Sequence, residues 1–235
     1  MEEAIRINKY LSEAGYCSRR QADRLVGEGR VTIDGKIAQM GDKVTDDQKV
    51  MVGKQRVLRE EPFIMIALNK PKGIVCTTAE VEKDNVVRFL NFKQRIYPVG
   101  RLDKDSEGLL LLTNQGELAN ELMKARNYHE KEYVVRVNKP LTKDFIKAMR
   151  DGVPILDTVT RPCKVRYVDK YTFEIILTQG LNRQIRRMCE YFGYRVVALK
   201  RIRIVNIELG KLKTGQWRYL TDNEIQEMKG LLKHE

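Results

Sequence analysis

Hydrophobic positions near the start of the chain follow short helical and extended periods. Two helices are predicted at residues 5–14 and 19–29, the second with Ser18 as its N-cap. In residues 30–36, apolar and polar side chains alternate as in a strand. The segment contains an Asp-Gly pair, which is typical of a tight hairpin turn. Together these patterns predict a small module of two helices and a hairpin.

A longer series of hydrophobic patterns runs from residue 63 to the end of the chain. Two buried strands are expected within 63–76, around a Pro-Lys-Gly turn. Further strands are expected at residues 96–100, 109–113, 131–138, 163–168, 171–178, 195–199, 201–209 and 216–220. Helices are expected at residues 84–92, 117–125, 142–152, 182–193 and 221–233, with Thr142, Asn182 and Thr221 capping the last three.

Strands and helices mix in this part of the chain without strict βαβ alternation. Such an order predicts the α+β class, with a mixed, largely antiparallel sheet flanked by helices. The polar stretch 53–62 ends in proline and separates the two sets of patterns. We therefore expect a small N-terminal α/β module at residues 1–50, a linker at 51–62 and a larger domain at 63–235.

The charge of the chain is high and unevenly distributed. The sequence holds 44 Lys and Arg residues against 32 Asp and Glu, a formal net charge of +12. Residues 1–62 carry a net charge of only +1, whereas residues 183–218 carry +8. Because these basic residues alternate with apolar ones on predicted helices and strands, they form a positive surface on a folded domain. A polyanion, most simply a nucleic acid, is the expected partner.

Several classes of protein are disfavoured by the same sequence. The longest apolar runs are far too short to span a bilayer, and the N-terminus lacks the layout of a signal peptide. We therefore expect a soluble cytoplasmic protein that does not associate with membranes. None of the four cysteines forms a C-x-x-C pair, which favours buried reduced thiols over disulfides or a zinc site. The two histidines, His129 and His234, offer little for histidine-based catalysis.

The segment GRLDKDSEGLLLLTN, residues 100–114, places Asp103 between an arginine and an apolar strand. Its acidic residues match the first half of a calcium-binding EF-hand loop, but the bidentate glutamate needed at position 12 is Asn114. A second alternative is that Asp103 or Asp105 only caps a turn. A third is that Asp103 is a nucleophile, which requires the carboxylate to stay ionised and aimed.

Arginines that could keep Asp103 ionised are concentrated in the predicted helix 182–193. Arg183, Arg186 and Arg187 lie in its first turns, and Ile185 is expected on its buried face. A guanidinium beside a carboxylate favours the charged form of that carboxylate. Tyr133, in the segment HEKEYVVRV, could supply an aromatic platform for a base.

These segments resemble a known family. GRLDKDSEGLLLLTN, KEY and QGLNRQIRRM are similar, in order and spacing, to the three motifs of bacterial pseudouridine synthases of the RsuA branch. HEKEY and NRQIRRMCE look closest to the RluF type, which acts on large-subunit (23S) ribosomal RNA. Residues 7–36 resemble an S4 domain, a small RNA-binding module. The resemblance covers nearly the whole chain and implies an enzyme that isomerises uridine in folded RNA.

The resemblance also implies roles for individual residues. Asp103 corresponds to the catalytic aspartate of the family, which attacks the target uridine at the ribose or at the ring. Tyr133 corresponds to the tyrosine that stacks on the flipped uracil, and Arg186 to the basic partner of the aspartate. Arg101 corresponds to the arginine that enters the RNA stack, and Ile185 to an apolar residue of the uracil pocket. Arg183 and Arg187 are expected to contact phosphate or to support the structure.

The remaining expectations concern partners and cofactors. In the S4-like module, the features that resemble RNA contacts are Lys9, Arg19, Arg20 and Arg24, although a solvated helix face would look the same. The reaction implied needs no metal and no cofactor, and we expect a monomer. Two alternatives remain: the same reaction on another RNA such as tRNA, and a non-catalytic ribosome-assembly factor.

Overall fold

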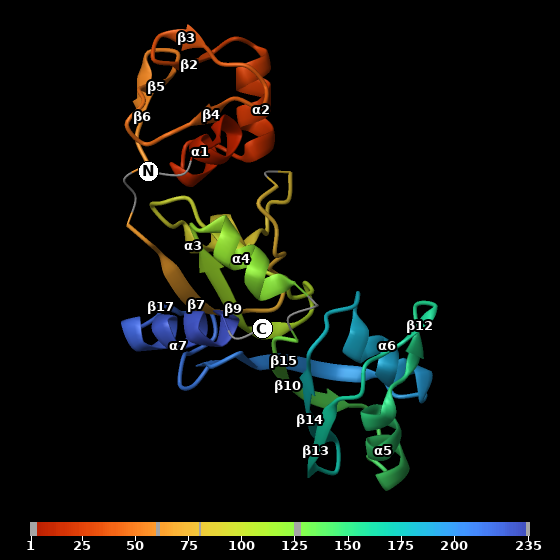
Figure 1. Ribbon diagram of the computed structural model, residues 1–235. Coiled ribbons are helices and arrows are strands. Elements are labelled where there is room, and N and C mark those ends of the chain that lie inside the picture. The colour runs from red at the N-terminus through yellow and green to blue at the C-terminus, as the bar shows by residue number, and fades with distance from the viewer. Residues whose placement is uncertain (1–3, 60–61, 80, 125–127, 234–235) are drawn as a thin grey trace. The chain divides into compact units, whose positions relative to one another are not determined.

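A computed structural model describes residues 4–59, 62–79, 81–124 and 128–233 of the chain (Figure 1). His234 therefore lies outside the described residues. The chain divides into two compact units, each described separately. The first unit comprises residues 1–64 with the short segments 92–96 and 114–116, and the second comprises the rest. No helix in the described part of the chain is long and apolar enough to cross a bilayer.

The first unit contains the two helices and the hairpin that the sequence predicts. The capping box of the second helix is present, because the Ser18 and Gln21 side chains each pair with the other residue's backbone. Asp34 and Gly35 both have positive φ, as a tight hairpin turn requires. The helices are α1 (Ile7–Glu13) and α2 (Arg19–Gly27), and the strands are β1 (Ile5–Arg6), β2 (Val31–Ile33), β3 (Lys36–Ile37), β4 (Lys43–Val44), β5 (Val50–Val52) and β6 (Gln55–Val57).

The segment expected to be a linker, residues 51–62, is partly ordered into this unit. β5 and β6 form a hairpin in the four-stranded sheet β3-β2-β5-β6. Val52 and Val57 are buried in the core of the unit, together with Tyr10 and Leu11. Residues 51–57 are therefore not a free linker, because their apolar side chains complete a small core. Residues 60–61 lie outside the described residues.

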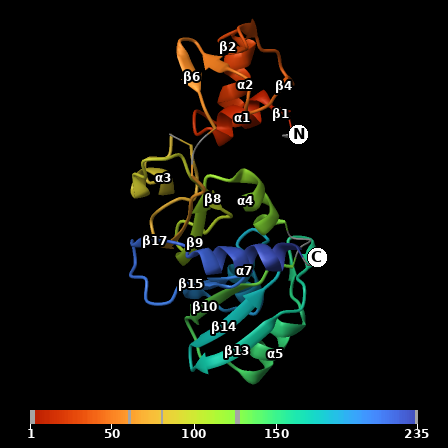
Figure 2. The same ribbon diagram turned by 60° about the vertical axis from the view of Figure 1, so that its left-hand side comes forward.

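The second unit is built on a nine-stranded sheet (Figures 1 and 2). Its main strand order is β13-β14-β10-β15-β9-β7-β17, with β8 paired to β9 and β16 paired to β15. The β9–β15 pair is parallel and the other described pairs of this sheet are antiparallel, as the sequence predicts for a mixed, largely antiparallel sheet. The strands are β7 (Met65–Lys70), β8 (Tyr97–Val99), β9 (Glu107–Thr113), β10 (Lys131–Val137), β13 (Lys164–Asp169), β14 (Thr172–Leu177), β15 (Val196–Ile204), β16 (Ile207–Glu208) and β17 (Trp217–Tyr219).

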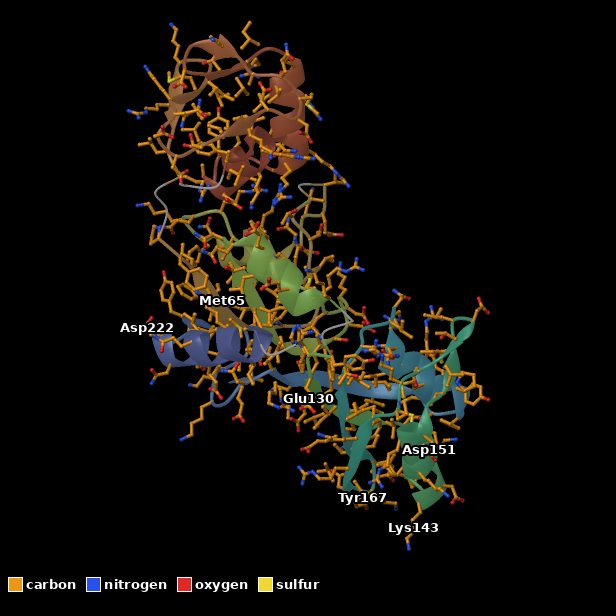
Figure 3. All side chains as sticks on the ribbon, viewed as in Figure 1. Met65, Glu130, Lys143, Asp151, Tyr167 and Asp222 are labelled. Atoms are coloured by element: carbon orange, nitrogen blue, oxygen red, sulfur yellow. The ribbon has the colours of Figure 1, made fainter. Side chains whose placement is uncertain are left out.

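Helices flank this sheet, which confirms the α+β class. α5 packs against β13, and α6 packs against the small hairpin β11–β12. Figure 3 marks the two ends of α5 by Lys143 and Asp151. Thr142 caps α5, and Thr221 and Glu224 form the predicted capping box at α7. The remaining elements are α3 (Val86–Leu90), α4 (Gly116–Met123), β11 (Pro154–Ile155), β12 (Thr158–Val159), α5 (Lys143–Asp151), α6 (Gln184–Tyr191) and α7 (Asp222–Lys233).

Three local predictions are wrong. The second strand expected within 63–76 is reduced to an isolated bridge at Val75. The strands expected at 195–199 and 201–209 are mostly one strand, β15, because both halves pair with β10. Asn182 does not cap α6: the N-cap is Arg183, whose φ of 50° is left-handed and whose side chain makes no capping hydrogen bond.

Candidate active site

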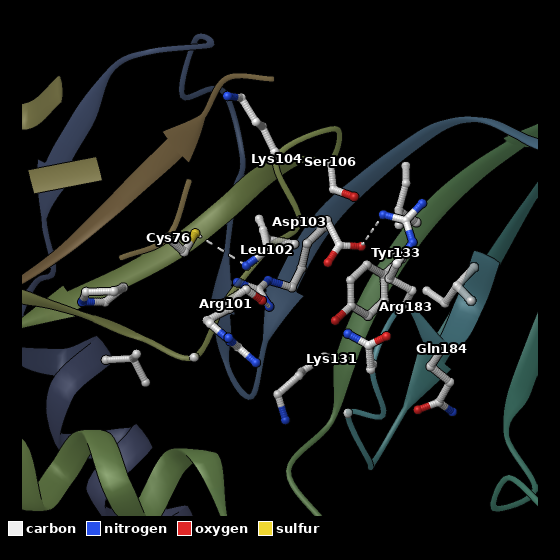
Figure 4. A pocket seen from close by; sticks show the side chains of 18 of the residues that line it. Cys76, Arg101, Leu102, Asp103, Lys104, Ser106, Lys131, Tyr133, Arg183 and Gln184 are labelled. Atoms are coloured by element: carbon white, nitrogen blue, oxygen red, sulfur yellow. Dashed lines mark hydrogen bonds and ion pairs between the residues drawn. The ribbon is translucent and has the colours of Figure 1, made fainter. Parts of the chain in front are cut away.

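A cleft of about 1380 Å3 opens in the second unit, and the Asp103 motif lines it (Figure 4). Six of the predicted site residues meet there although they come from three separate segments of the chain. These six are Arg101, Asp103, Tyr133, Arg183, Ile185 and Arg186. The sheet explains this convergence, because β9, β10 and β15 are neighbours and the loop that carries Asp103 leads directly into β9.

Gly108, the second residue of β9, allows β9 to lie close to β15 directly after the loop that carries Asp103. It has φ of +107° and pairs with Arg201 across the parallel β9–β15 contact. A Cβ atom at this position would lie 2.3 Å from the backbone oxygen of Arg201, so a side chain cannot be accommodated without movement. This glycine therefore fixes the distance between the Asp103 loop and β15.

Asp103 lies beside two arginines, as the sequence predicts. Its Oδ2 is 3.5 Å from Nη1 of Arg183 and 3.9 Å from Nε of Arg186. Both separations are longer than an ordinary hydrogen bond, so the contacts are ion pairs. About a third of the Asp103 side chain remains exposed, at 34%. A charged and accessible carboxylate is suited to act as a nucleophile.

The two arginines make closer contacts with Asp105, a residue to which the sequence assigned no role. Oδ1 of Asp105 is 3.3 Å from Nη1 of Arg183, and its Oδ2 is 3.2 Å from Nη2 of Arg186. Burial raises the pKa of the Asp105 carboxyl, but the hydrogen bond from Arg183 and the charges of Arg186 and Arg183 together lower it below its ordinary value. Asp105 is thus held as a carboxylate.

Tyr133 and Ile185 shape the cleft beside Asp103. Figure 4 shows the Tyr133 ring and the Asp103 carboxylate facing the same space. Tyr133 lies on β10 between β14 and β15, where Ile175 and Arg201 are its partners. Ile185 is 5% exposed and joins the hydrophobic core while also lining the cleft. This pair gives the cleft an aromatic and an aliphatic wall, which suits a planar base.

Two other predicted residues differ in their position. Arg101 is exposed on the rim of the cleft, where Figure 4 shows its side chain. Arg187 does not line the cleft and instead donates hydrogen bonds to the backbone and side-chain oxygens of Asn182. Its observed contacts support the turn that precedes α6.

Three further cations near the cleft were not singled out from the sequence. Lys131 lines it two residues before Tyr133, and burial together with the charge of Arg201 lowers the Lys131 pKa to about 8. Arg201 is 2% exposed, donates to the backbone of Leu109 and Arg101, and has a buried Nη2 without a hydrogen-bond partner among the described residues. Lys70 is fully buried and donates to the Ser106 backbone oxygen. The alternation on β10, which puts Lys131 on the same face as Tyr133, is the signal that could have identified Lys131.

Basic side chains of the first unit gather on and near α2. Arg19, Arg20 and Arg24 are exposed, and Arg20 and Arg24 share a helix face because they are four residues apart. Lys9, on α1, pairs with Glu13 at 3.6 Å. The three α2 arginines are therefore available to a polyanion.

The calcium-loop alternative does not fit this geometry. An EF-hand requires a helix after its loop, whereas residues 107–113 form β9. The described residues contain no group of three or more acidic, histidine or cysteine side chains placed to hold a metal ion. The four cysteines are free, and burial raises the pKa of each thiol.

Comparisons with known proteins agree with this architecture. Residues 64–191 match the family model described as RNA pseudouridylate synthase, and residues 5–50 match the S4 domain. The chain is 51% identical to the dual-specificity RNA pseudouridine synthase RluF of Escherichia coli K12, over 99% of this chain and 81% of the relative. It is 39% identical to the ribosomal large subunit pseudouridine synthase B of Bacillus subtilis, over 97% of each chain.

Among solved structures, a pseudouridylate synthase at 26% identity superimposes with a TM-score of 0.69, covering 95% of this chain and 99% of that one. The family model spans more than half of the chain and contains the cleft loop, β10 and the whole of α6. This chain belongs to the RNA pseudouridylate synthase family and carries an S4 domain at its N-terminus.

Proposed function

We propose that this enzyme converts a uridine of 23S ribosomal RNA to pseudouridine, with Asp103 as the nucleophile. The observation that carries the assignment is the convergence of Asp103, Tyr133 and Arg186 in one cleft. The names of two relatives support the substrate, because one refers to the ribosomal large subunit and the other to RNA in general. The net charge of +12 suits a polyanionic substrate.

The reaction is an isomerisation that balances within the substrate. The bond between N1 of uracil and C1′ of ribose breaks, and a bond between C5 and C1′ forms. The proton on C5 is lost and N1 gains one, so no electron acceptor or group donor is needed. Asp103 attacks the target nucleotide and holds it while the base rotates. Arg183 and Arg186 keep this carboxylate charged beside a polyanion.

The other cleft residues bind and orient the base. A uridine in folded RNA must leave its stack, at a cost of roughly a few kcal/mol. Arg101, exposed on the rim, can occupy the vacated space because a guanidinium stacks on bases and stays charged. Tyr133, which lines the cleft with Ile185, then stacks on the flipped uracil and accepts the C5 proton, while Ile185 forms the apolar side.

The S4 unit supplies a second contact with the RNA. Arg19, Arg20 and Arg24 on α2, with Lys9 nearby, contact the backbone of a stem or loop. Residues 1–50 thus act in docking and residues 63–235 in catalysis, within a monomer that works in the cytoplasm without metal or cofactor.

The substitution Asp103→Asn tests this proposal directly. It removes the nucleophile but keeps the shape of the side chain. Pseudouridine formation, detected by carbodiimide labelling of 23S RNA, should be abolished. RNA affinity should stay within about tenfold, or roughly 1.4 kcal/mol. Normal turnover by Asp103→Asn would overturn the nucleophile assignment, and an inactive wild-type chain that binds ribosomal RNA would favour the ribosome-assembly alternative.

A second RNA substrate is a specific alternative. The relative from Escherichia coli K12 is named dual-specificity, and it is 51% identical to this chain. We therefore propose tRNA as the other candidate substrate. Pseudouridine maps of 23S RNA and total tRNA from cells with and without the enzyme would distinguish one substrate from two.

A further inference from the structure

The two ends of the Arg186 guanidinium have different surroundings: Nη2 makes short contacts, whereas Nε does not. Its Nη2 makes three contacts at 3.2 Å: to the Asp105 carboxylate, to the Asp105 backbone oxygen and to Oγ of Ser106. Its Nε faces Asp103 at 3.9 Å, is buried and makes no hydrogen bond among the described residues. The whole side chain is 9% exposed, so the guanidinium has little freedom to turn.

Arg183 is shared between the same two carboxylates. It lies 3.3 Å from Asp105 and 3.5 Å from Asp103. Both arginines therefore approach Asp105 more closely than they approach Asp103. Each one contributes positive charge at Asp103 while its shorter contacts are made elsewhere.

This division matters because a guanidinium can also block a carboxylate. A bidentate arginine pair engages both carboxylate oxygens in short, strong hydrogen bonds. A nucleophile in that state must break those bonds before it can attack. An ion pair at 3.5 to 3.9 Å keeps the charge favourable and leaves the oxygen lone pairs accessible.

We propose that Asp105 and Ser106 are positioning residues that hold Arg183 and Arg186 at ion-pair distance from Asp103 and prevent them from closing on it. The inference rests on the proposed role of Asp103 and deepens it. Asp105 competes for both arginines, and Ser106, which is 1% exposed, fixes Arg186 from within the protein. The lowered pKa of Asp105 is consistent with its carrying charge throughout catalysis.

The test is the substitution Asp105→Asn, measured by single-turnover pseudouridine formation at saturating enzyme across about pH 3 to 8, which includes the range where carboxylates ordinarily titrate. The arginines should close on Asp103, so the rate should fall by about tenfold or more. The fall in rate on the acidic side should move to lower pH, because the cleft loses a negative charge while both arginines remain. RNA affinity should change by less than about threefold. Asp105→Glu, which keeps the charge, should restore most of the rate and the wild-type acidic limb.

Two controls isolate the effect. Asp84 forms an ion pair with Lys104 of the Asp103 loop, with 3.7 Å between Oδ2 and Nζ. Asp84→Asn removes the same amount of charge as Asp105→Asn and should react like wild type. Asp103→Asn tests the nucleophile separately: activity there would overturn the proposed function rather than the role of Asp105. An Asp105→Asn enzyme with wild-type rate and acidic limb would overturn the positioning role. A loss of rate with an unmoved acidic limb would also overturn it, because a merely structural role predicts that result.

Discussion

At the scale of single residues, the catalytic unit concentrates cations beneath and around one carboxylate. Lys70 and Arg201 are buried and donate to backbone oxygens of residues on either side of Asp103, and Lys131 lines the cleft. Buried charges of one sign are costly because burial removes them from water. The positive charge of these residues attracts a phosphate backbone, and their burial lowers the stability of the free enzyme.

The burial of Lys131 should make the free energy of unfolding depend on pH. Its folded-state pKa is lowered to about 8, against an ordinary value of 10.5, by burial and by the charge of Arg201. Between about pH 8 and 10.5 the unfolded chain binds more protons at this residue, so stability should rise with pH in that window. Lys131→Met lacks this contribution. Urea unfolding should show the wild type gaining about 1–3 kcal/mol relative to Lys131→Met between pH 7 and 10. Parallel pH curves for the two proteins would contradict the shifted pKa.

At the scale of elements, the site depends on the parallel contact between β9 and β15. Antiparallel neighbours surround this contact, and it joins residues that are more than ninety positions apart. It places the Asp103 loop beside Arg201, which donates to the backbone of Leu109 and Arg101. The loop is thus fixed to the sheet by backbone geometry and by one buried guanidinium.

Gly108→Ala should disrupt that contact. The new Cβ would lie 2.3 Å from the Arg201 backbone oxygen, and the φ of +107° is unfavourable for alanine. We expect a loss of more than about 2 kcal/mol in the free energy of unfolding, measured in urea. Gly230→Ala is the matched control, because it lies inside α7 with nothing within 4 Å of its added Cβ. That substitution should stabilise by about 0.5–1 kcal/mol. Equal effects at the two glycines would rule out the close approach.

At the scale of the whole molecule, the two units have separate cores. The core of the first unit contains residues from α1, α2 and the strands up to Val57. One core of the second unit lies among β10, β13, β14, β15, α5 and α6. The complete nine-stranded sheet and the cleft belong to the second unit. Each unit thus contains the apolar contacts that it needs to fold.

Removal of residues 1–61 should therefore leave a folded catalytic unit. This truncation keeps Pro62 and Ile64, whose backbones bond to the Asn114 side chain at 2.9 Å. Thermal unfolding followed by circular dichroism should remain cooperative. The dissociation constant for the natural RNA should rise by about tenfold or more, while the single-turnover rate at saturating enzyme changes little. Unchanged affinity would show that the S4 unit does not dock the RNA.

Much of the local structure was predictable because its causes lie within a few residues. Ser18, Thr142 and Thr221 cap helices through hydrogen bonds to backbone groups three positions away. The Asp34–Gly35 turn likewise follows from local backbone preference. The long motifs around Asp103 and Arg186 also identify the family from sequence alone, and the family model confirms this prediction.

By itself, therefore, the sequence determined three of the four predicted caps, the hairpin, the α+β class and the family, whereas contacts between distant segments decided the rest. Residues 55–57 look like linker until β6 pairs with β5 and buries Val57. Arg183 looks helical until α6 begins one residue later. Asp105 looks like a turn residue until the fold brings two arginines from about eighty positions away within 3.3 Å of its carboxylate. Local hydrogen bonds are encoded in adjacent residues, but strand partners and shared ion pairs depend on which segments the tertiary structure brings together.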